Sequence, residues 1–315
     1  MPLLSWRGSR RPGGESERDG ERIPVAKLGS DLPGNSASIG RRAEIFATCA
    51  NPRCRSGWLK LWRRREAPVF EGGWCCSPEC TEVQVEAAVS REMDARGEPV
   101  DAHHHRIPLG LAMLEQGWLT QAELRAGLAA QRSAGRGRIG DWLVRQKSVT
   151  ELEVTRALGL QWGCPVLGVE LYNPEGLTAL VPRLFVDAMG ALPLRVAAGK
   201  IVYLGFLDRP EPGLALAIQR ITGLRVETGL VEQSMFHPAL ARLLEAPFPV
   251  VELIEAVTQP ALVTAMARAV EQGHPVESRL ARVRDTLWMR MWLEPQRGPV
   301  PDPASVRDLI GSIGT

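Results

Sequence analysis

Apolar residues recur at helical spacing over residues 107–162, and the pattern occurs twice. A shift of 30 residues superimposes 109–131 on 139–161. Six positions are then identical: Gly110/Gly140, Gln116/Gln146, Thr120/Thr150, Glu123/Glu153, Leu128/Leu158 and Gln131/Gln161. Five further positions have Leu, Ile, Val or Met in both copies. This agreement indicates a tandem repeat of one helical unit.

Each copy also carries its own signals for where helices break and restart. A short helix is expected to end near Gly117 in the first copy and near Lys147 in the second. Thr120 with Glu123, and Thr150 with Glu153, then match the capping box that begins a helix. The sequence therefore predicts two helical hairpins related by approximate internal symmetry, over residues 107–168.

Residues 169–246 change to a mixed pattern of helices and strands. Leu192–Val196 and Ile201–Phe206 flank a turn at 198–200 and predict a hairpin. A helix over 213–221, a strand over 224–231 and a helix over 234–244 follow. We expect a small α/β sandwich that packs beside the helical repeat.

The segment 247–315 is predicted to be a mostly helical extension. Val250–Val257 and Ala261–Val270 have apolar residues at helical spacing. Leu280–Leu293, which contains Trp288 and Trp292, fits a hairpin or a helix.

Five of the six cysteines fall between residues 49 and 80. Cys49 and Cys54 form a C-x4-C pair, and Cys76 and Cys80 form a C-x3-C pair. In a reducing compartment such pairs are metal ligands more often than disulfides, and four thiolates suit tetrahedral Zn²⁺ at a closed structural site. Either Cys75 or Cys76 fits as the third ligand, and buried cysteines without a metal are the alternative.

Residues 57–63 alternate as a strand does, and Ser77-Pro78 is placed to start a helix over 81–89. Two ligands at the first turn of a helix, after a knuckle and a hairpin, resemble a treble-clef zinc finger. The resemblance implies a zinc-binding module over 41–90. Cys164 is far from the other cysteines in sequence and is expected to be a core residue.

The composition of the chain indicates the class of protein and the segments that are not expected to fold. The 315 residues are 44% hydrophobic and 23% charged, as in a globular protein, and no apolar run is long enough for a transmembrane helix. The first residues are too short in apolar character for a signal peptide, so a cytoplasmic location is expected. Residues 1–40 lack any apolar period and are expected to be disordered, and 91–106, with His103–His105, is expected to be a linker.

The tandem repeat resembles the N-terminal domain of type II secretion and type IV pilus assembly ATPases, the GspE/MshE N-terminal domain. One branch of that family carries two copies of R-L-G-x-x-L-x(10)-L-x-x-x-L-x-x-Q. The second copy here departs only conservatively from that motif, whereas Pro108 replaces the arginine of the first copy. The resemblance continues through about residue 245.

The resemblance implies that the repeat reads cyclic di-GMP, a ligand with two guanines and two phosphates. Arg138 would hydrogen-bond a guanine edge or a phosphate, the glycines would admit backbone close to the ligand, and the glutamines would offer donors and acceptors. The apolar positions would face the bases, or they are simply helix-helix core. The implied ligand residues are Arg138, Ile139, Gly140, Leu143, Val154, Leu158 and Gln161 in the second copy, and Leu109, Gly110, Met113, Leu124, Leu128 and Gln131 in the first.

The chain contains no G-x-x-x-x-G-K-[ST] loop, and Gly199-Lys200 is followed by Ile201. We therefore predict a non-enzymatic α+β protein, an adaptor that senses cyclic di-GMP and passes the signal to a protein partner such as a secretion or pilus component. One alternative is a ligand-free docking scaffold. The other is a zinc-dependent nucleic-acid-binding regulator, since residues 1–70 carry 14 basic and 7 acidic side chains, a net charge of +7.

Overall fold

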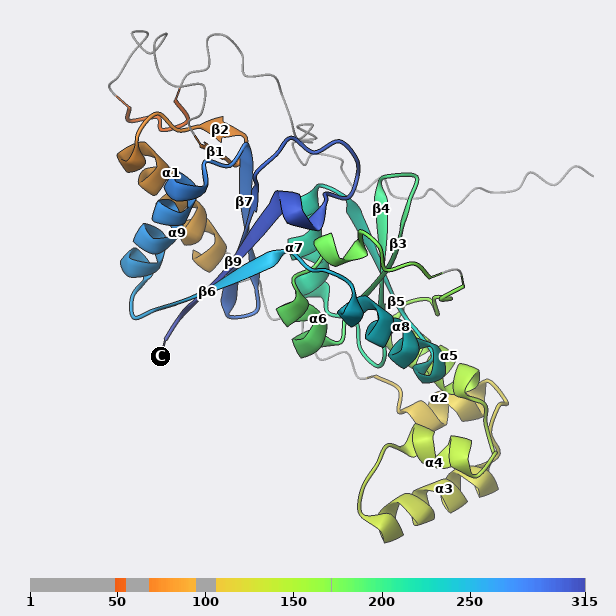
Figure 1. Ribbon diagram of the computed structural model, residues 1–315. Helices are drawn as coiled ribbons and strands as arrows, with labels where there is room; N and C mark the ends of the chain where they lie inside the picture. The colour runs from red at the N-terminus through yellow and green to blue at the C-terminus, as the bar shows by residue number, and fades with distance from the viewer. Residues whose placement is uncertain (1–48, 55–67, 95–105, 171, 315) are drawn as a thin grey trace, which may run out of the picture. The chain divides into compact units, whose positions relative to one another are not determined.

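The structure, a computed structural model, describes residues 49–54, 68–94, 106–170 and 172–314 (Figure 1). Within these ranges helices and sheets occur together, which confirms the α+β class. The expected disordered arm, the strand at 57–63 and the histidines at 103–105 lie outside the described residues. No helix in the described part is long and apolar enough to cross a membrane.

The tandem repeat forms four helices, as the sequence predicted. They are α2 (Leu109–Glu115), α3 (Gln121–Ala134), α4 (Ile139–Arg145) and α5 (Glu151–Trp162). Both capping boxes are present: Thr120 caps α3 with Glu123, and Thr150 caps α5 with Glu153. Helix α2 packs on α5 and α3 packs on α4, so each short helix contacts the long helix of the other copy.

The α/β part follows the predicted order. Its elements are η2 (Leu177–Ala179), α6 (Arg183–Met189), β3 (Leu192–Ala197), β4 (Ile201–Phe206), α7 (Pro212–Thr222), β5 (Arg225–Leu230) and α8 (Gln233–Glu245). Strand β4 is the centre of a three-stranded sheet, antiparallel to β3 and parallel to β5. The hairpin and the helices expected between 192 and 244 are thus confirmed, with ends shifted by one or two residues.

The prediction of a mostly helical C-terminal extension was wrong. One helix, α9 (Gln259–Gly273), confirms the expected helix at 261–270, but the rest is a four-stranded sheet in the order β6-β9-β8-β7. The strands are β6 (Val250–Ala256), β7 (Glu277–Val283), β8 (Thr286–Trp292) and β9 (Val306–Ile313), with η3 (Pro303–Ser305) before β9. The expected helix at 250–257 is β6, and 280–293 lies in the hairpin β7–β8.

Strands β7, β8 and β9 are largely buried on both faces of the sheet, whereas most of β6 is exposed. One face, which includes Trp288 and Ile310, joins the hydrophobic cluster of the α/β part. The opposite face, which includes Met289 and Leu309, joins a cluster with α9 and with α1 (Pro78–Asp94). A short hairpin, β1 (Val69–Phe70) and β2 (Gly73–Trp74), precedes α1 and contributes Phe70 to the same cluster.

Helix α1, which follows the cysteines, therefore shares its core with strands more than 150 residues later in the chain. It packs along α9, and Val85 and Val89 are fully buried in the cluster. The boundaries expected at 41–90 and 247–315 stay predictions, and this shared core favours one packed unit over two independent modules.

An ion pair without solvent access lies in the sheet. Arg290 of β8 donates from Nε to Oδ1 of Asp308 on β9 and from Nη2 to Oδ2, both at 2.7 Å. Trp288 Nε1 also donates to Asp308, at 2.8 Å, and Arg290 Nη1 donates to the Ala179 carbonyl of η2. The pair thus has additional hydrogen-bond partners, as a buried pair requires, and it links the sheet to the α/β part.

Glu277, at the start of β7, carries a different kind of buried charge. Its Oε1 accepts a 2.9 Å hydrogen bond from the Gly72 amide, and burial raises the pKa of Glu277 above the usual carboxyl range. A raised pKa means that the folded state disfavours the charged carboxylate. The carboxylate therefore destabilises the folded protein above its unfolded-state pKa, and this destabilisation fades as the pH falls.

We therefore expect Glu277→Gln, which keeps the acceptor, to raise the free energy of unfolding at about pH 7 and to have little effect near pH 3. Urea titrations at both pH values measure this. Glu86→Gln, at an exposed position of α1, is the control for removing a carboxylate. A gain that is equal at both pH values would contradict the argument.

Candidate functional site

The repeat brings its two glutamines into equivalent hydrogen bonds. Gln131 Nε2 donates to the Gly137 carbonyl at 2.8 Å, and Gln161 Nε2 donates to the Ile107 carbonyl at 2.5 Å. Residues 107 and 137 are themselves 30 positions apart, and each immediately precedes the first residue of a motif. Each glutamine therefore anchors a motif start through its backbone, and the two bonds obey the internal symmetry.

The two motif glycines are also used in the same way. A Cβ on Gly110 would lie 2.6 Å from a methyl carbon of Leu124, and a Cβ on Gly140 would lie 2.8 Å from one of Val154. Both contacts are shorter than van der Waals distance, so a larger residue at either position would force the facing side chain, Leu124 or Val154, to shift. Close helix packing is thus a reason for these glycines that involves no ligand.

The apolar motif positions divide into two groups. Met113 and Leu143 have no solvent access and form the centre of the repeat core. In this conformation they contribute packing. The other six are partly exposed, and all but Leu128 pack against a hydrophobic cluster: Leu109, Leu124, Leu128, Ile139, Val154 and Leu158.

Arg138 is the most accessible member of the motif. It is the residue that precedes α4, its side chain is 66% exposed, and its guanidinium pairs with Asp208 just after β4. The sequence pointed to Arg138 but missed Asp208, because no spacing links residues 70 positions apart. In the first copy Pro108 takes the equivalent place, and Arg106 stacks over the Trp162 ring at 3.4 Å from its centroid.

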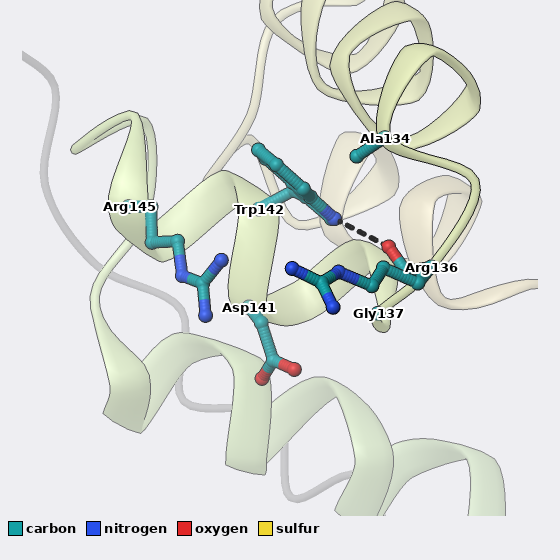
Figure 2. A pocket seen from close by; sticks show the side chains of 6 residues that line it. All are labelled: Ala134, Arg136, Gly137, Asp141, Trp142 and Arg145. Carbon is teal, nitrogen blue, oxygen red and sulfur yellow. Dashed lines mark hydrogen bonds between the residues drawn. The ribbon is translucent and has the colours of Figure 1, made fainter.

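A pocket of about 290 Å³ lies beside the second motif (Figure 2). Its lining includes Arg136, Asp141, Trp142 and Arg145, and both guanidinium groups point into the space beside the indole. Trp142 Nε1 donates to the Arg136 carbonyl at 3.1 Å, and Arg145 lies 5.3 Å from the ring centroid. Cationic and aromatic groups at one opening are suited to an anionic ligand with a planar base.

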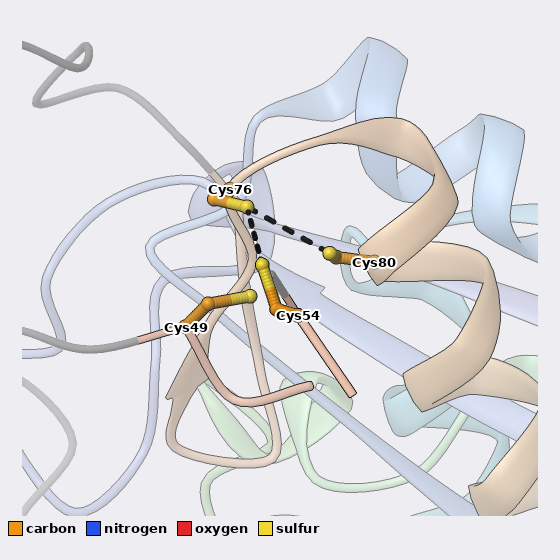
Figure 3. Close-up of side chains that lie close together, drawn as sticks. All are labelled: Cys49, Cys54, Cys76 and Cys80. Atoms are coloured by element: carbon orange, nitrogen blue, oxygen red, sulfur yellow. Dashed lines mark hydrogen bonds between the residues drawn. The ribbon is translucent and has the colours of Figure 1, made fainter. Parts of the chain in front are cut away.

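The four expected metal ligands lie together. The sulfur atoms of Cys49, Cys54, Cys76 and Cys80 are all within 4.8 Å of one another (Figure 3). Cys54 and Cys76 are 3.5 Å apart, and Cys76 and Cys80 are 3.7 Å apart. Tetrahedral zinc with bonds of about 2.3 Å places its sulfurs about 3.8 Å apart, so the cluster has the dimensions of a four-thiolate site.

Cys75 is excluded from this cluster. It is buried among Phe70 and the α1 side chains, and burial raises its thiol pKa to about 11. Cys76 faces the other cysteines from the position before Ser77, which accepts from the Cys80 amide as α1 begins. Of the two candidates that the sequence left open, Cys76 and not Cys75 lies beside the other three cysteines.

Asn51 is a site residue that the sequence analysis missed. Its side chain is buried, donates from Nδ2 to Cys80 Sγ at 3.4 Å and accepts from the Arg53 amide at 2.9 Å. An asparagine between two cysteines of a tight knuckle is a detectable signal, since this residue type stabilises such turns. Burial raises the pKa of the neighbouring Cys49 thiol to about 12, and a bound cation would lower it.

No protein-family model matches the chain. Over 140 residues, 42% of its length, it is 32% identical to the type IV pilus assembly ATPase PilB of Thermus thermophilus. The resemblance to these ATPases is confirmed. The chain spans only 15% of that relative's length, so the activity and partners of the whole ATPase are not properties that the match assigns.

Two solved structures are also similar to this chain. The structure of MshE with cdg has 21% sequence identity and a TM-score of 0.35, and covers 44% of this chain and 99% of its own. The N-terminal domain of XpsE has 18% identity and a TM-score of 0.29, and covers 42% and 92%. At these scores the likeness assigns neither a fold nor a function.

Proposed function

We propose that the protein is a non-enzymatic adaptor whose tandem repeat binds cyclic di-GMP and transmits its occupancy to a protein partner of a secretion or pilus system. The symmetric use of Gln131 and Gln161 carries the proposal, because it sets two equivalent motif starts in fixed positions. A ligand with two guanines and two phosphates requires such a pair of half-sites. The sequence match to a pilus assembly ATPase supports the same class of system.

Arg138 would couple ligand binding in the repeat to the contact between the repeat and the α/β part. Its guanidinium is exposed and held by Asp208, on the loop after β4. A phosphate or guanine that takes the guanidinium hydrogen bonds competes with this carboxylate. Binding would therefore release the contact between the repeat and the α/β part, which provides a route from ligand to partner surface.

We expect saturable calorimetric binding of cyclic di-GMP to the full chain, and a loss of about ten- to a hundredfold in affinity for Arg138→Ala. Arg225→Ala is the matched control, since Arg225 also forms an exposed ion pair, with Glu227, outside the repeat. Pro108→Arg should strengthen binding by restoring the first half-site. Absence of saturable binding at about millimolar ligand would contradict the proposal.

A ligand-free docking scaffold is the second candidate function, and specific observations favour it. Pro108 lacks the guanidinium of the motif, and contacts with Leu124 and Val154 inside the repeat are a reason for Gly110 and Gly140 that involves no ligand. This candidate predicts that neither the native chain nor Pro108→Arg binds the dinucleotide.

A nucleic-acid role depends on the basic residues 1–70 and predicts binding that weakens steeply with salt.

We also propose that Cys49, Cys54, Cys76 and Cys80 hold one structural Zn²⁺. The sulfur separations and the placement of Cys80 in the first turn of α1 support this assignment. Four thiolates leave no open position for a substrate, so the metal would supply folding energy alone. Because α1 packs in the hydrophobic cluster that it shares with the C-terminal sheet, zinc binding would also stabilise that cluster.

A further inference from the structure

The C-terminal sheet ends in two different edges. At one edge, the residues before and along β7 are covered by the β1 segment, where the Val69 amide donates to the Pro275 carbonyl and the Glu71 amide to Ser278. At the other edge, β6 pairs in parallel with β9 from Val250↔Arg307 to Ala256↔Ile313, and no other described strand pairs with it. Seven residues of unbroken register therefore end in an edge strand.

The direction of the backbone groups of β6 follows from one hydrogen bond. The Ala256 carbonyl accepts from the Gly314 amide at 2.9 Å, so Ala256 faces β9. Since residues alternate in direction along a parallel ladder, 250, 252 and 254 also face β9. Val251, Leu253 and Glu255 thus direct their amides and carbonyls away from the sheet.

This edge has little of the usual protection against pairing. It carries two exposed glutamates, Glu252 and Glu255, but no proline, lysine or bulge. Its apolar side chains are exposed: Val250 by 67%, Leu253 by 64% and, just beyond it, Val257 by 86%. Natural edge strands of this length are normally shielded by such features or by a covering segment. An open apolar edge of seven residues is suited to the addition of another strand.

We propose that β6 pairs antiparallel with β6 of a second copy of this chain, about a two-fold axis at Leu253. An axis at any residue from Val251 to Glu255 pairs outward residues with outward residues, because hydrogen-bonded and non-hydrogen-bonded pairs alternate along an antiparallel ladder. An axis at Glu252 places two glutamates directly opposite, and an axis at Ile254 pairs only 252–256 of the strand with its copy. Centring at Glu255 places two glutamates directly opposite, which is destabilising, and centring at Val251 brings Pro249, without an amide, into the ladder.

Centring at Leu253 avoids all of these defects. Leu253 then meets Leu253 of the second copy, Val251 meets Glu255, and Glu252 lies opposite Ile254, so no like charges face each other. Of the possible axes, only the one at Leu253 pairs all seven residues of β6 without opposed like charges or a proline, and this self-complementarity favours a second copy as the occupant. Two four-stranded sheets would join into one through a small isologous interface, so a weak, concentration-dependent dimer is expected.

Sedimentation velocity of the full chain over a range of concentrations tests the proposal. We expect reversible dimerisation, weakened by about tenfold or more in Leu253→Lys, which places two ammonium groups on the axis. Leu216→Lys is the matched control, since Leu216 of α7 is 63% exposed but lies outside the strand. It should dimerise as the native chain does.

A second variant reports the geometry directly. Hydrogen-bonded antiparallel residues have Cα atoms about 5.5 Å apart, which lies within disulfide range. Leu253→Cys should therefore oxidise to a dimer linked at position 253, identified by mass spectrometry, and Leu216→Cys should not. A native chain that stays monomeric, a dimer insensitive to Leu253→Lys, or equal cross-linking of the two cysteine variants would each overturn the proposal.

Discussion

Asp308→Ala is expected to lower the free energy of unfolding by about 3–5 kcal/mol, because it leaves the Arg290 guanidinium buried without a counter-charge. Neither side chain has solvent access in the native protein. The carboxylate also accepts from Trp288, so the substitution removes an acceptor for two residues. Urea unfolding followed by circular dichroism measures the loss.

The controls separate burial from charge. Glu227→Ala removes one partner of the exposed pair Arg225–Glu227 and should change the free energy of unfolding by less than about 1 kcal/mol. The double variant Arg290→Met/Asp308→Leu, which removes both charges, should recover much of the loss. If Asp308→Ala behaves as Glu227→Ala does, Arg290 is hydrated in solution and the buried network is not intact.

Cys80→Ser is expected to abolish tight zinc binding, whereas the native chain should purify with one zinc ion per molecule. Zinc sites of this type contribute about 10–16 kcal/mol of binding energy in small peptides. Metal content by mass spectrometry, together with protease resistance of residues 68–94, measures the effect. Because α1 packs on α9, we expect cleavage in α1 to increase when the metal is lost.

Cys75 provides the matched control, since it is adjacent in sequence to a ligand but buried in the hydrophobic cluster. Cys75→Ala should keep the full zinc content, and so should Cys164→Ser. If Cys80→Ser retains as much zinc as Cys75→Ala, the four-thiolate assignment is incorrect.

The parts of the fold that the sequence predicted are those whose signals are local. Thr120 and Glu123 satisfy each other within one helical turn, and the same is true of Thr150 and Glu153. The hairpin of β3 and β4 likewise depends on a turn of a few residues. The cysteine spacing indicated the four-sulfur cluster for the same reason, since each pair lies within a single knuckle or turn.

Strand β6 was mispredicted because its apolar residues fit a helix. Val250, Leu253, Ile254 and Val257 have the spacing of one helical face. Pairing with β9, more than 50 residues later, decides its conformation, and no local pattern reports that pairing. The sequence did not predict the role of Asp208 or the buried Arg290–Asp308 pair for a similar reason, since it does not identify the partner of a charged residue.

The shared core of α1, α9 and the C-terminal sheet has a consequence for the order of folding. Ser278 Oγ donates to the Val69 carbonyl across 209 residues, whereas each capping box closes across three. Loop-closure entropy rises slowly with length, so this long connection costs little stability, but contacts of such separation form late. We therefore expect the helical repeat to form before α1 docks on the sheet during folding.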